Sequence, residues 1–188
     1  MRIILASSSP RRYELMKLLN IPFEVIAKEV DETFNGKDVY ESSMQVSKRK
    51  AEVVFKDINE DVIVIGSDSV VYKDGVVYGK PKSYEEAYNM LSSYNESYHD
   101  VITSLCMLIR KNGETHEELT YSKSTVYFNK ISDEEINEWI NNNDVYSKAG
   151  AYAIQENFGK HIKRIDGDYF AIVGLSINQV YHLLKKYL

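Results

Sequence analysis

The run VIVIGSDSVV, residues 62–71, decides the fold class, because it sets one carboxylate between two apolar stretches. Its first part, Val62–Gly66, shows no polar alternation, which is typical of a strand buried on both faces of a sheet. Gly66 permits close backbone approach at this point. We expect Asp68 to lie past the carboxyl end of this strand, where open α/β sheets bind ligands. A structural Asp that caps a turn is the alternative interpretation.

The pattern extends outward from this run as alternating apolar segments and capped helices. Ser9 is a good N-cap and Pro10 a good first helical residue, and Asp74-Gly75 is a strong hairpin signal. Further strands are predicted at Arg2–Ala6, Phe23–Ala27, Val70–Tyr72, Val76–Tyr78, His99–Arg110, Ser124–Phe128, Gly150–Ile154 and His161–Gly174. Helices are predicted after Ser9, over Val39–Phe55, after the capping boxes Ser83/Glu86 and Ser132/Glu135, and after Ser176/Gln179. This order predicts an α/β fold with a long twisted mixed sheet flanked by helices, forming two lobes around a cleft in a single domain over residues 1–188.

Composition limits the classes of function. The 188 residues are 44% hydrophobic and 27% charged, as in an ordinary globular protein, and the net charge is -5. An acidic chain is a poor candidate for binding nucleic acid through phosphates. The single cysteine, Cys106, cannot form an internal disulfide and reads as a buried small residue. The sequence shows no signal-peptide core and no membrane span, so we expect a cytoplasmic protein.

A basic cluster, SSSPRR at residues 7–12, falls between a predicted strand and a helix N-terminus. Unpaired backbone N–H groups at such a terminus bind anions, and neighbouring hydroxyls add donors. Cations in a first helical turn oppose the helix dipole, and a bound phosphate reverses that effect. Ser7, Arg11 and Arg12 therefore indicate a phosphate site. A capped helix with two solvated arginines is the structural alternative.

Several other polar residues become informative only in combination. Asp31-Glu32 follows a predicted strand, but adjacent loop carboxylates are usually solvated surface. Lys80, in a Gly-Lys-Pro turn, and Lys50, on a helix, could each reach a phosphate and could each be simply exposed. Gln155 has both the donor and the acceptor that reading a base edge requires.

Two aromatic positions favour a structural role over a chemical one. His99 could act as a base, although a hydrogen-bonded structural histidine at a strand start is the preferred interpretation. Tyr152 could stack on a base, although a half-buried strand aromatic is the default.

Taken together and in order, these segments resemble the Maf family of nucleoside triphosphate pyrophosphatases, over nearly the whole chain. The matching segments are 5–12 (LASSSPRR), 31–32 (DE), 50–51 (KA), 66–71 (GSDSVV), 79–81 (GKP), His99 with 101–103 (VIT), 148–155 (KAGAYAIQ), 165–169 (IDGDY) and 173–175 (VGL). The resemblance implies an inosine-triphosphatase-like fold, often dimeric. It also implies hydrolysis between the α and β phosphates, and the segment 150–155 looks like the branch that acts on dTTP and UTP.

The resemblance assigns roles to individual residues. Asp68 would be the general base, and Glu32 with Asp68 would hold Mg²⁺ or Mn²⁺. The triphosphate clamp would be Ser7, Arg11, Arg12, Lys50 and Lys80. Base preference would be set by Arg11, Ser69 and Gln155. The physical chemistry agrees, because a triphosphate needs cations and a metal for charge neutralisation, and the attacking water needs a base.

The chain departs from the family pattern at several positions. Asn95-Glu96 stands where Ser-Gly is usual, Ser147 replaces an Asp, and Ser176 replaces a Pro. After Gln155, residues 156–159 (ENFG) replace a Gly-x-Gly-Ala loop. Two functions therefore stay open, an active pyrophosphatase and a nucleotide-binding regulator linked to septum formation. A nucleic-acid module is disfavoured by the acidic charge.

Overall fold

The central strand β3 (Val62–Lys73) runs without interruption through the motif that decides the fold. The computed structural model describes residues 1–188. Its first eight residues, except the half-buried Ser69, are buried, as the apolar pattern predicts. The prediction that the strand ends at Gly66 is wrong, because Asp68 lies inside β3. β3 lies between β1 and β5 in the sheet, and its register with β1 ends at Ile65, so the extended backbone continues past the end of that pairing.

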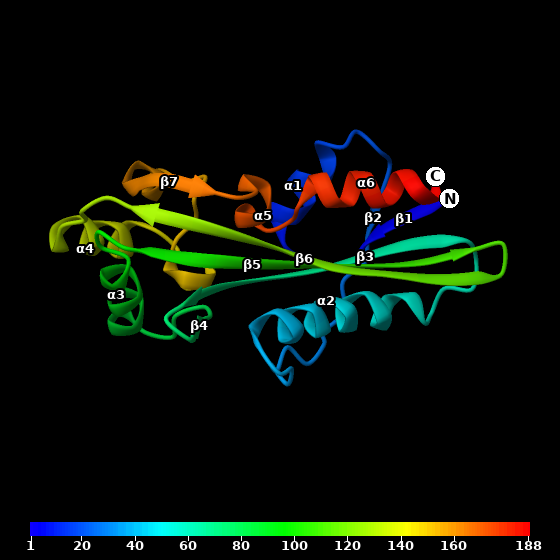
Figure 1. Cartoon of the computed structure of the whole chain (residues 1–188), viewed down its shortest axis with the longest axis horizontal. Coiled ribbons are helices and arrows are strands. Elements are labelled where there is room, and N and C mark those ends of the chain that lie inside the picture. Colours follow the sequence, from blue (N-terminus) through cyan, green and yellow to red (C-terminus); the bar gives the residue numbers. More distant parts are fainter. The chain divides into compact units, whose positions relative to one another are not determined.

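One mixed sheet of seven strands organises the chain, in the order β2-β1-β3-β5-β6-β7, with β4 paired to β3 (Figure 1). β1 pairs in parallel with β2 and with β3, whereas β4 pairs antiparallel with β3 and β7 antiparallel with β6. The remaining bounds are β1 (Arg2–Leu5), β2 (Glu24–Val25), β4 (Val76–Tyr78), β5 (Tyr98–Lys111), β6 (Glu114–Phe128) and β7 (Ile162–Asp166). The predicted α/β class with a long mixed sheet is confirmed.

The bounds of the helices are α1 (Pro10–Lys17), α2 (Val39–Phe55), α3 (Tyr84–Ser93), α4 (Asp133–Asn142), α5 (Tyr169–Val173) and α6 (Ile177–Tyr187). Helices α1, α3, α4 and α6 begin directly after the predicted cap residues Ser9, Ser83, Ser132 and Ser176. Ser132 and Glu135 form a reciprocal capping box. Ser83 also caps its helix, but Glu86 accepts from the Lys82 N–H instead of closing the box. No helix combines the length and the apolar character that crossing a membrane requires.

Two segments predicted as strands adopt other structures. Ala149–Ala151 is a 3-10 turn, in which Gly150 has a φ of 70°. The predicted strand His161–Gly174 is shortened to β7, and α5 follows it. Aromatic and β-branched residues in these segments imitate a strand pattern, but their side chains fill the core around turns.

The chain divides into two compact units, which are described separately. The first comprises residues 1–69, 103–122 and 174–188, and the second comprises residues 70–102 and 123–173. In the first unit, α2 covers one face of the sheet, and α1 and α6 cover the other (Figure 1). Its core includes Cys106, which is fully buried, so burial raises the pKa of its thiol to about 12 and leaves it unreactive.

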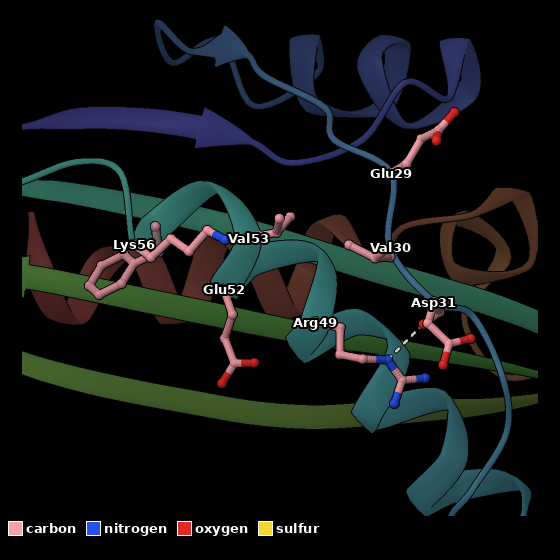
Figure 2. A pocket seen from close by; sticks show the side chains of 8 residues that line it. Glu29, Val30, Asp31, Arg49, Glu52, Val53 and Lys56 are labelled. Atoms are coloured by element: carbon pink, nitrogen blue, oxygen red, sulfur yellow. Dashed lines mark hydrogen bonds between the residues drawn. The ribbon is translucent and has the colours of Figure 1, made fainter.

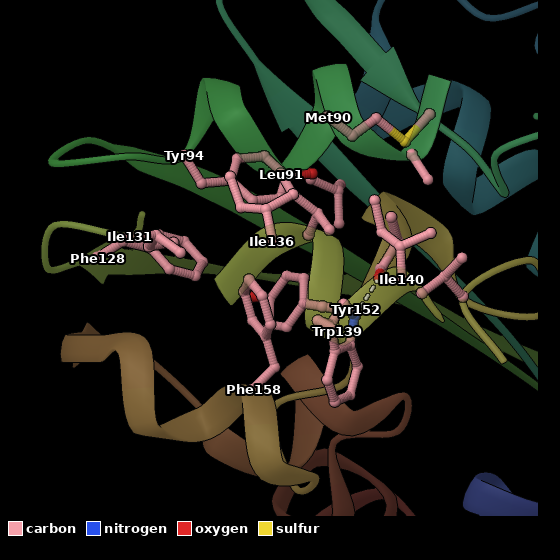
Figure 3. Packing of buried hydrophobic residues seen from close by; sticks show 14 of the residues in the cluster. Met90, Leu91, Tyr94, Phe128, Ile131, Ile136, Trp139, Ile140, Tyr152 and Phe158 are labelled. Carbon is pink, nitrogen blue, oxygen red and sulfur yellow. Dashed lines mark hydrogen bonds between the residues drawn. The ribbon is translucent and has the colours of Figure 1, made fainter. Parts of the chain in front are cut away.

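The second unit has an aromatic core, shown in Figure 3. Phe158 lies at its centre and is 1% exposed. The Phe158 ring packs against the rings of Trp139, Tyr152, His161 and Phe128 at centroid distances of 5.0–6.4 Å. Rings at these separations stabilise a core beyond the area they bury.

Candidate active site

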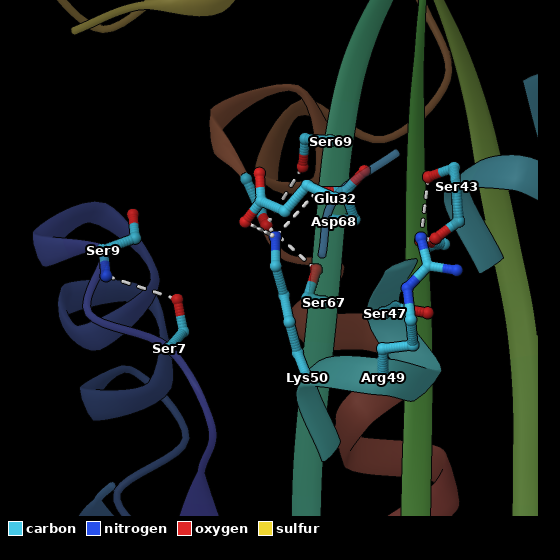
Figure 4. Close-up of polar contacts among 12 residues, drawn as sticks. Ser7, Ser9, Glu32, Ser43, Ser47, Arg49, Lys50, Ser67, Asp68 and Ser69 are labelled. Atoms are coloured by element: carbon cyan, nitrogen blue, oxygen red, sulfur yellow. Dashed lines mark hydrogen bonds and ion pairs between the residues drawn. The ribbon is translucent and has the colours of Figure 1, made fainter. Parts of the chain in front are cut away.

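Three charged side chains of the first unit meet at one ammonium group (Figure 4). The Lys50 Nζ lies 2.9 Å from the Asp68 Oδ1 and 2.9 Å from the Glu32 Oε1. The Asp68 side chain is 9% exposed, that of Lys50 13% and that of Glu32 63%. Lys50 therefore bridges a buried carboxylate and a solvent-facing one, each from a different part of the sequence.

The close packing of α2 on β3 brings Lys50 to Asp68. At Gly66, an added Cβ would lie 2.2 Å from the Ser47 carbonyl oxygen and 2.9 Å from the Ala51 nitrogen. Only a residue without a side chain allows this approach. Close backbone approach at Gly66 is confirmed, and the partner is helix α2.

One oxygen of Asp68 has no protein partner. The Oδ1 accepts a hydrogen bond from Lys50, while the Oδ2 is buried and makes no hydrogen bond. Buried polar atoms are rarely left unpaired, and those that are commonly belong to functional sites. The Oδ2 is thus free to accept a proton or to ligate a cation.

The β1–α1 connection presents donors, as the basic motif predicts. Ser9 is the N-cap of α1, but its side chain makes no capping hydrogen bond. The Ser7 Oγ instead accepts from the Ser9 N–H at 3.2 Å and from the Arg12 Nη1 at 3.3 Å. The first-turn N–H groups of Arg11 and Arg12 are without a side-chain cap, which leaves this terminus suited to an anion.

Arg12 is held in place by a backbone carbonyl. Its Nε donates to the Gly174 carbonyl oxygen at 2.9 Å, and its Nη2 donates to the Ser69 Oγ at 3.4 Å. Desolvation lowers the pKa of Arg12, whereas the negative charges of Asp68 and Glu32 act in the opposite direction. The charge of Arg12 and the charges of Asp68 and Glu32 therefore interact within this unit.

Two further residues, Gly174 and Arg49, anchor this arrangement, and no role was predicted for either from the sequence. The Gly174 carbonyl oxygen accepts from Arg12 and also from the Ser67 and Ser69 hydroxyls, at 3.3 Å and 3.4 Å. Arg49, next to Lys50 on α2, donates to the loop that carries Glu32. Gly174 acts through its backbone, which leaves no side-chain signal, and Arg49 reads as an ordinary helix-surface cation.

Lys80 and Gln155 belong to the second unit and are described apart from the Asp68 group. Both side chains are exposed. The Gly79 carbonyl oxygen, one residue before Lys80, accepts from the Gly150 N–H at 2.9 Å. The turn that carries Lys80 and the segment that leads to Gln155 are therefore joined by a backbone hydrogen bond.

His99 and Tyr152 form a buried pair, in agreement with the structural interpretation of both. His99 is fully buried, and its Nε2 lies 2.9 Å from the Tyr152 hydroxyl. The His99 Nδ1 lies 3.3 Å from the Asp100 carbonyl oxygen, which can only accept, so Nδ1 carries the proton and Nε2 accepts from Tyr152. Burial lowers the pKa of His99 to about 4. The ring is thus neutral near pH 7.

The loop after Gln155, residues 156–159, is folded, and the negative charge of Glu156 is paired with Lys148. Phe158 enters the aromatic core, and the Glu156 Oε1 lies 3.4 Å from the Nζ of the buried Lys148. The Lys148 Nζ also donates to the Asp144 carbonyl oxygen at 2.6 Å. Glu156 and Phe158, at positions where the resemblance implies glycine, therefore contribute an ion pair and an aromatic anchor.

The donor set formed by the carboxylates of Asp68 and Glu32 fits a hard divalent cation. No cluster of three or more His, Cys, Asp or Glu side chains that could hold a metal occurs in the chain. Mg²⁺, however, is commonly bound by one or two carboxylates together with substrate phosphates and water. The unpaired Asp68 Oδ2 and the exposed carboxylate of Glu32 match that requirement.

The fold and the site define a mixed α/β protein with a buried carboxylate, a bridging lysine and an arginine-bearing helix N-terminus, an arrangement suited to a polyanion with a metal. The family model described as Maf-like protein matches residues 2–187. The chain belongs to the Maf family, as its motifs indicate.

Curated relatives match over almost their whole length. A protein named dTTP/UTP pyrophosphatase from Caldanaerobacter subterraneus is 37% identical over 99% of this chain and 89% of its own. Proteins with the same name from Clostridium novyi and Caldicellulosiruptor bescii are 41% and 40% identical, over 97% and 98% of this chain and 96% and 94% of their own. Among solved structures, a HAM1 protein from Coxiella burnetii is similar over 68% of this chain and 73% of its own, with a TM-score of 0.46 and 13% identity. At that level the structural likeness adds nothing to the family assignment.

Proposed function

We propose that this chain is a nucleoside triphosphate pyrophosphatase that hydrolyses dTTP and UTP to the monophosphate and pyrophosphate. One observation carries the proposal: the buried Asp68 keeps one oxygen on Lys50 and the other without a partner, beside an arginine-bearing helix terminus. The names of the curated relatives support the choice of this reaction over a purely regulatory role.

The cations and donors of the first unit would hold the triphosphate. Ser7 and Arg12 are already joined by a hydrogen bond, and Arg11 precedes Arg12 in the same helical turn. Lys50 is the third cation of this set, and Lys80, which belongs to the second unit, is proposed separately as a phosphate contact. A triphosphate carries several negative charges, so a set of fixed cations binds it and also stabilises charge that moves to the leaving pyrophosphate.

Glu32 and Asp68 would hold Mg²⁺ or Mn²⁺. When bound, such a cation neutralises phosphate oxygens and draws electron density from the bond that breaks. Lys50 keeps the two carboxylates together without a bound cation, because its ammonium is within hydrogen-bond distance of both.

Asp68 would also act as the general base. The water oxygen forms a bond to phosphorus, the anhydride P–O bond between the α and β phosphates breaks, and pyrophosphate leaves. The proton of the water passes to the Asp68 carboxylate, of which one oxygen, the Oδ2, has no protein partner. A base positioned in this way contributes a factor of about 10²–10⁴ to the rate.

Base preference would rest on Arg11, Ser69 and Gln155. Ser69 is held through its hydroxyl by Arg12 and Thr103. Gln155 is exposed in the second unit, and its amide can both donate to and accept from a pyrimidine edge.

The proposal includes the setting in which the enzyme works. It treats residues 1–188 as a single Maf-like domain, places the protein in the cytoplasm and needs neither nucleic acid nor a membrane. It also includes a homodimer, for which the first unit offers exposed apolar surface at Leu119, Tyr121 and Tyr181. Sedimentation of the purified protein tests the dimer.

Pyrophosphate release from a panel of nucleoside triphosphates, with Mg²⁺ or with Mn²⁺, tests the activity. We expect release from dTTP and UTP, and a loss of about 10²–10⁴-fold in kcat for Asp68→Asn, which keeps the shape of the side chain and removes the base. Circular dichroism and thermal unfolding check that the variant is folded.

Two outcomes would contradict the proposal. Wild-type protein that binds nucleotides without releasing pyrophosphate would favour the regulator instead. Undiminished turnover by a folded Asp68→Asn variant would remove Asp68 from the role of base.

A further inference from the structure

Glu32 lies in a segment that has no regular secondary structure to hold it. Residues 26–35 contain neither helix nor strand. The Glu32 side chain is 63% exposed, and its carboxylate is held by the Lys50 ammonium. A flexible side chain on an irregular loop is poorly fixed by one exposed ion pair, because such pairs contribute little. Some other contact must hold the backbone.

Arg49 makes that contact with both neighbours of Glu32, and Figure 2 shows the bond to Asp31. Its Nε donates to the Asp31 carbonyl oxygen at 2.7 Å, and its Nη2 donates to the Thr33 carbonyl oxygen at 2.7 Å. A guanidinium presents its donors in a rigid planar fork, so two short bonds to two carbonyls fix the peptide units between them. The chain between those two carbonyls consists of Glu32 and Thr33.

We propose that Arg49 is a positioning residue that fixes the Asp31–Thr33 backbone and so presents the Glu32 carboxylate to Lys50 and Asp68. The effect on turnover rests on the proposed function, whereas the ordering of the loop does not. Arg49 acts through Glu32 and is not a ligand of the substrate.

The arrangement of the loop supports this role. The Thr33 N–H donates to the Asp31 Oδ1 at 2.8 Å, which closes a local turn around Glu32. The far end of the loop is tied to the start of α2, where the Gly36 N–H donates to the Ser42 Oγ at 3.0 Å. Arg49 supplies the tie to α2 at the end that carries Glu32.

Because Arg49 and Lys50 are neighbours on α2, the same helix holds both the backbone and the carboxylate of Glu32. Arg49 holds the backbone on either side of Glu32, and the next residue, Lys50, holds its carboxylate. Both side chains leave the same helix, which is fixed against β3 at Gly66. The distance between Glu32 and Asp68 is therefore set by one rigid element.

Two substitutions of Arg49 separate the effect of its two parallel hydrogen bonds from the effect of its positive charge. Arg49→Lys keeps the positive charge but cannot make two parallel bonds, and Arg49→Gln loses both. Lys56→Gln is the matched control. Lys56 directly follows α2, lines the same pocket as Arg49 (Figure 2), and donates no side-chain hydrogen bond to the loop. All three proteins are compared with the wild type as the full chain.

Amide hydrogen exchange of the Thr33 N–H is the first measurement. We expect exchange about tenfold faster in both Arg49→Lys and Arg49→Gln, because the loop loses bonds from a charged donor, and no change in Lys56→Gln. Wild-type exchange in Arg49→Lys would overturn the inference, since charge alone would then hold the loop.

A double-mutant cycle with Glu32→Gln is the second measurement. If Arg49 acts through Glu32, the loss of kcat caused by Arg49→Gln disappears when Glu32 is already replaced. An undiminished loss in the Glu32→Gln background would overturn the inference and assign Arg49 to the substrate. A wild-type protein without pyrophosphate release would refute the proposed function, and the exchange measurement would still decide the role of Arg49.

Discussion

The two units hold their motif residues in place by different physical means. In the first unit, Lys50, Asp68 and Glu32 meet as charges, and one Asp68 oxygen is left without a partner. In the second unit, Tyr152 and Phe158 are buried in a core in which the hydroxyl of Tyr152 and the ring nitrogens of His99 have partners.

The difference separates residues placed for chemistry from residues placed for folding. A buried carboxylate oxygen without a partner is destabilising by itself, so the unpaired Asp68 Oδ2 indicates a functional demand. A satisfied aromatic core needs no ligand to explain it. Substitutions in the second unit should therefore lower stability, while those around Asp68 should lower activity to a greater extent than stability.

Phe158→Ala should cause the largest change in stability. The side chain is 1% exposed and is surrounded by aromatic rings, so its removal leaves a cavity. We expect the free energy of unfolding, measured by urea denaturation, to fall by about 3–5 kcal/mol. Phe158→Leu serves as the control, with a smaller loss. A loss below about 1 kcal/mol for Phe158→Ala would show that the loop is not anchored by this ring.

Gly66→Ala should lower both stability and turnover. The added methyl group would lie 2.2 Å from the Ser47 carbonyl oxygen, so α2 must move away from β3 and take Lys50 with it. We expect a loss of about 3 kcal/mol in the free energy of unfolding, together with reduced pyrophosphate release.

Gly79→Ala is the stability control for this substitution, because a Cβ at Gly79 would meet no atom within 4 Å. Its unfolding midpoint in urea should stay close to that of the wild type. Equal losses in the two variants would contradict the role of close packing at Gly66.

His99→Gln should remove a pH dependence of stability that belongs to the second unit. Burial lowers the pKa of His99 from 6.5 to about 4, so between these values the unfolded chain binds a proton that the folded chain does not. Stability from this group is present above pH 6.5 and is lost as the pH falls toward 4. Between pH 7 and pH 5 the wild type should lose about 2 kcal/mol relative to the variant. Parallel pH profiles of the two proteins would contradict this assignment.

Tyr94→Phe should have the smallest effect of the four. The buried Tyr94 hydroxyl donates to the Gly150 carbonyl oxygen at 3.1 Å, and its loss leaves that oxygen without this bond. We expect a loss of about 1 kcal/mol in the free energy of unfolding. Tyr98→Phe, at a residue that is 51% exposed, is the matched control and should cause little change. A loss no greater than that of the control would show that the bond contributes nothing.

Sequence reasoning located most elements because their signals are local. Ser132 with Glu135 gave a true capping box, and Val39–Phe55 is a helix with the predicted bounds. It failed where an element depends on its neighbours. β3, which lies beside β5 in the sheet, continues through Asp68. Residues 150–154 are not a strand, and Ala151, Tyr152 and Ile154 belong to the core of the second unit.

The candidate site was predicted in part for the same reason. Asp68, Lys50 and Glu32 were named from their motifs, and the structure brings them to one ammonium group. Arg49 and Gly174 were missed, because a helix-surface arginine and a backbone carbonyl carry no sequence signal of the contacts they make.

The sequence by itself determined the α/β class, the helix starts and the side chains available for chemistry, because periodicity, caps and residue type are local properties. Only the tertiary structure decided that Asp68 keeps a buried oxygen unpaired, that helix α2 packs closely against Gly66, and that Arg49 donates hydrogen bonds to both neighbours of Glu32. The contacts of Arg49 with the loop and of Lys50 with Asp68 join residues 16 to 18 positions apart. The packing of whole elements fixes such contacts.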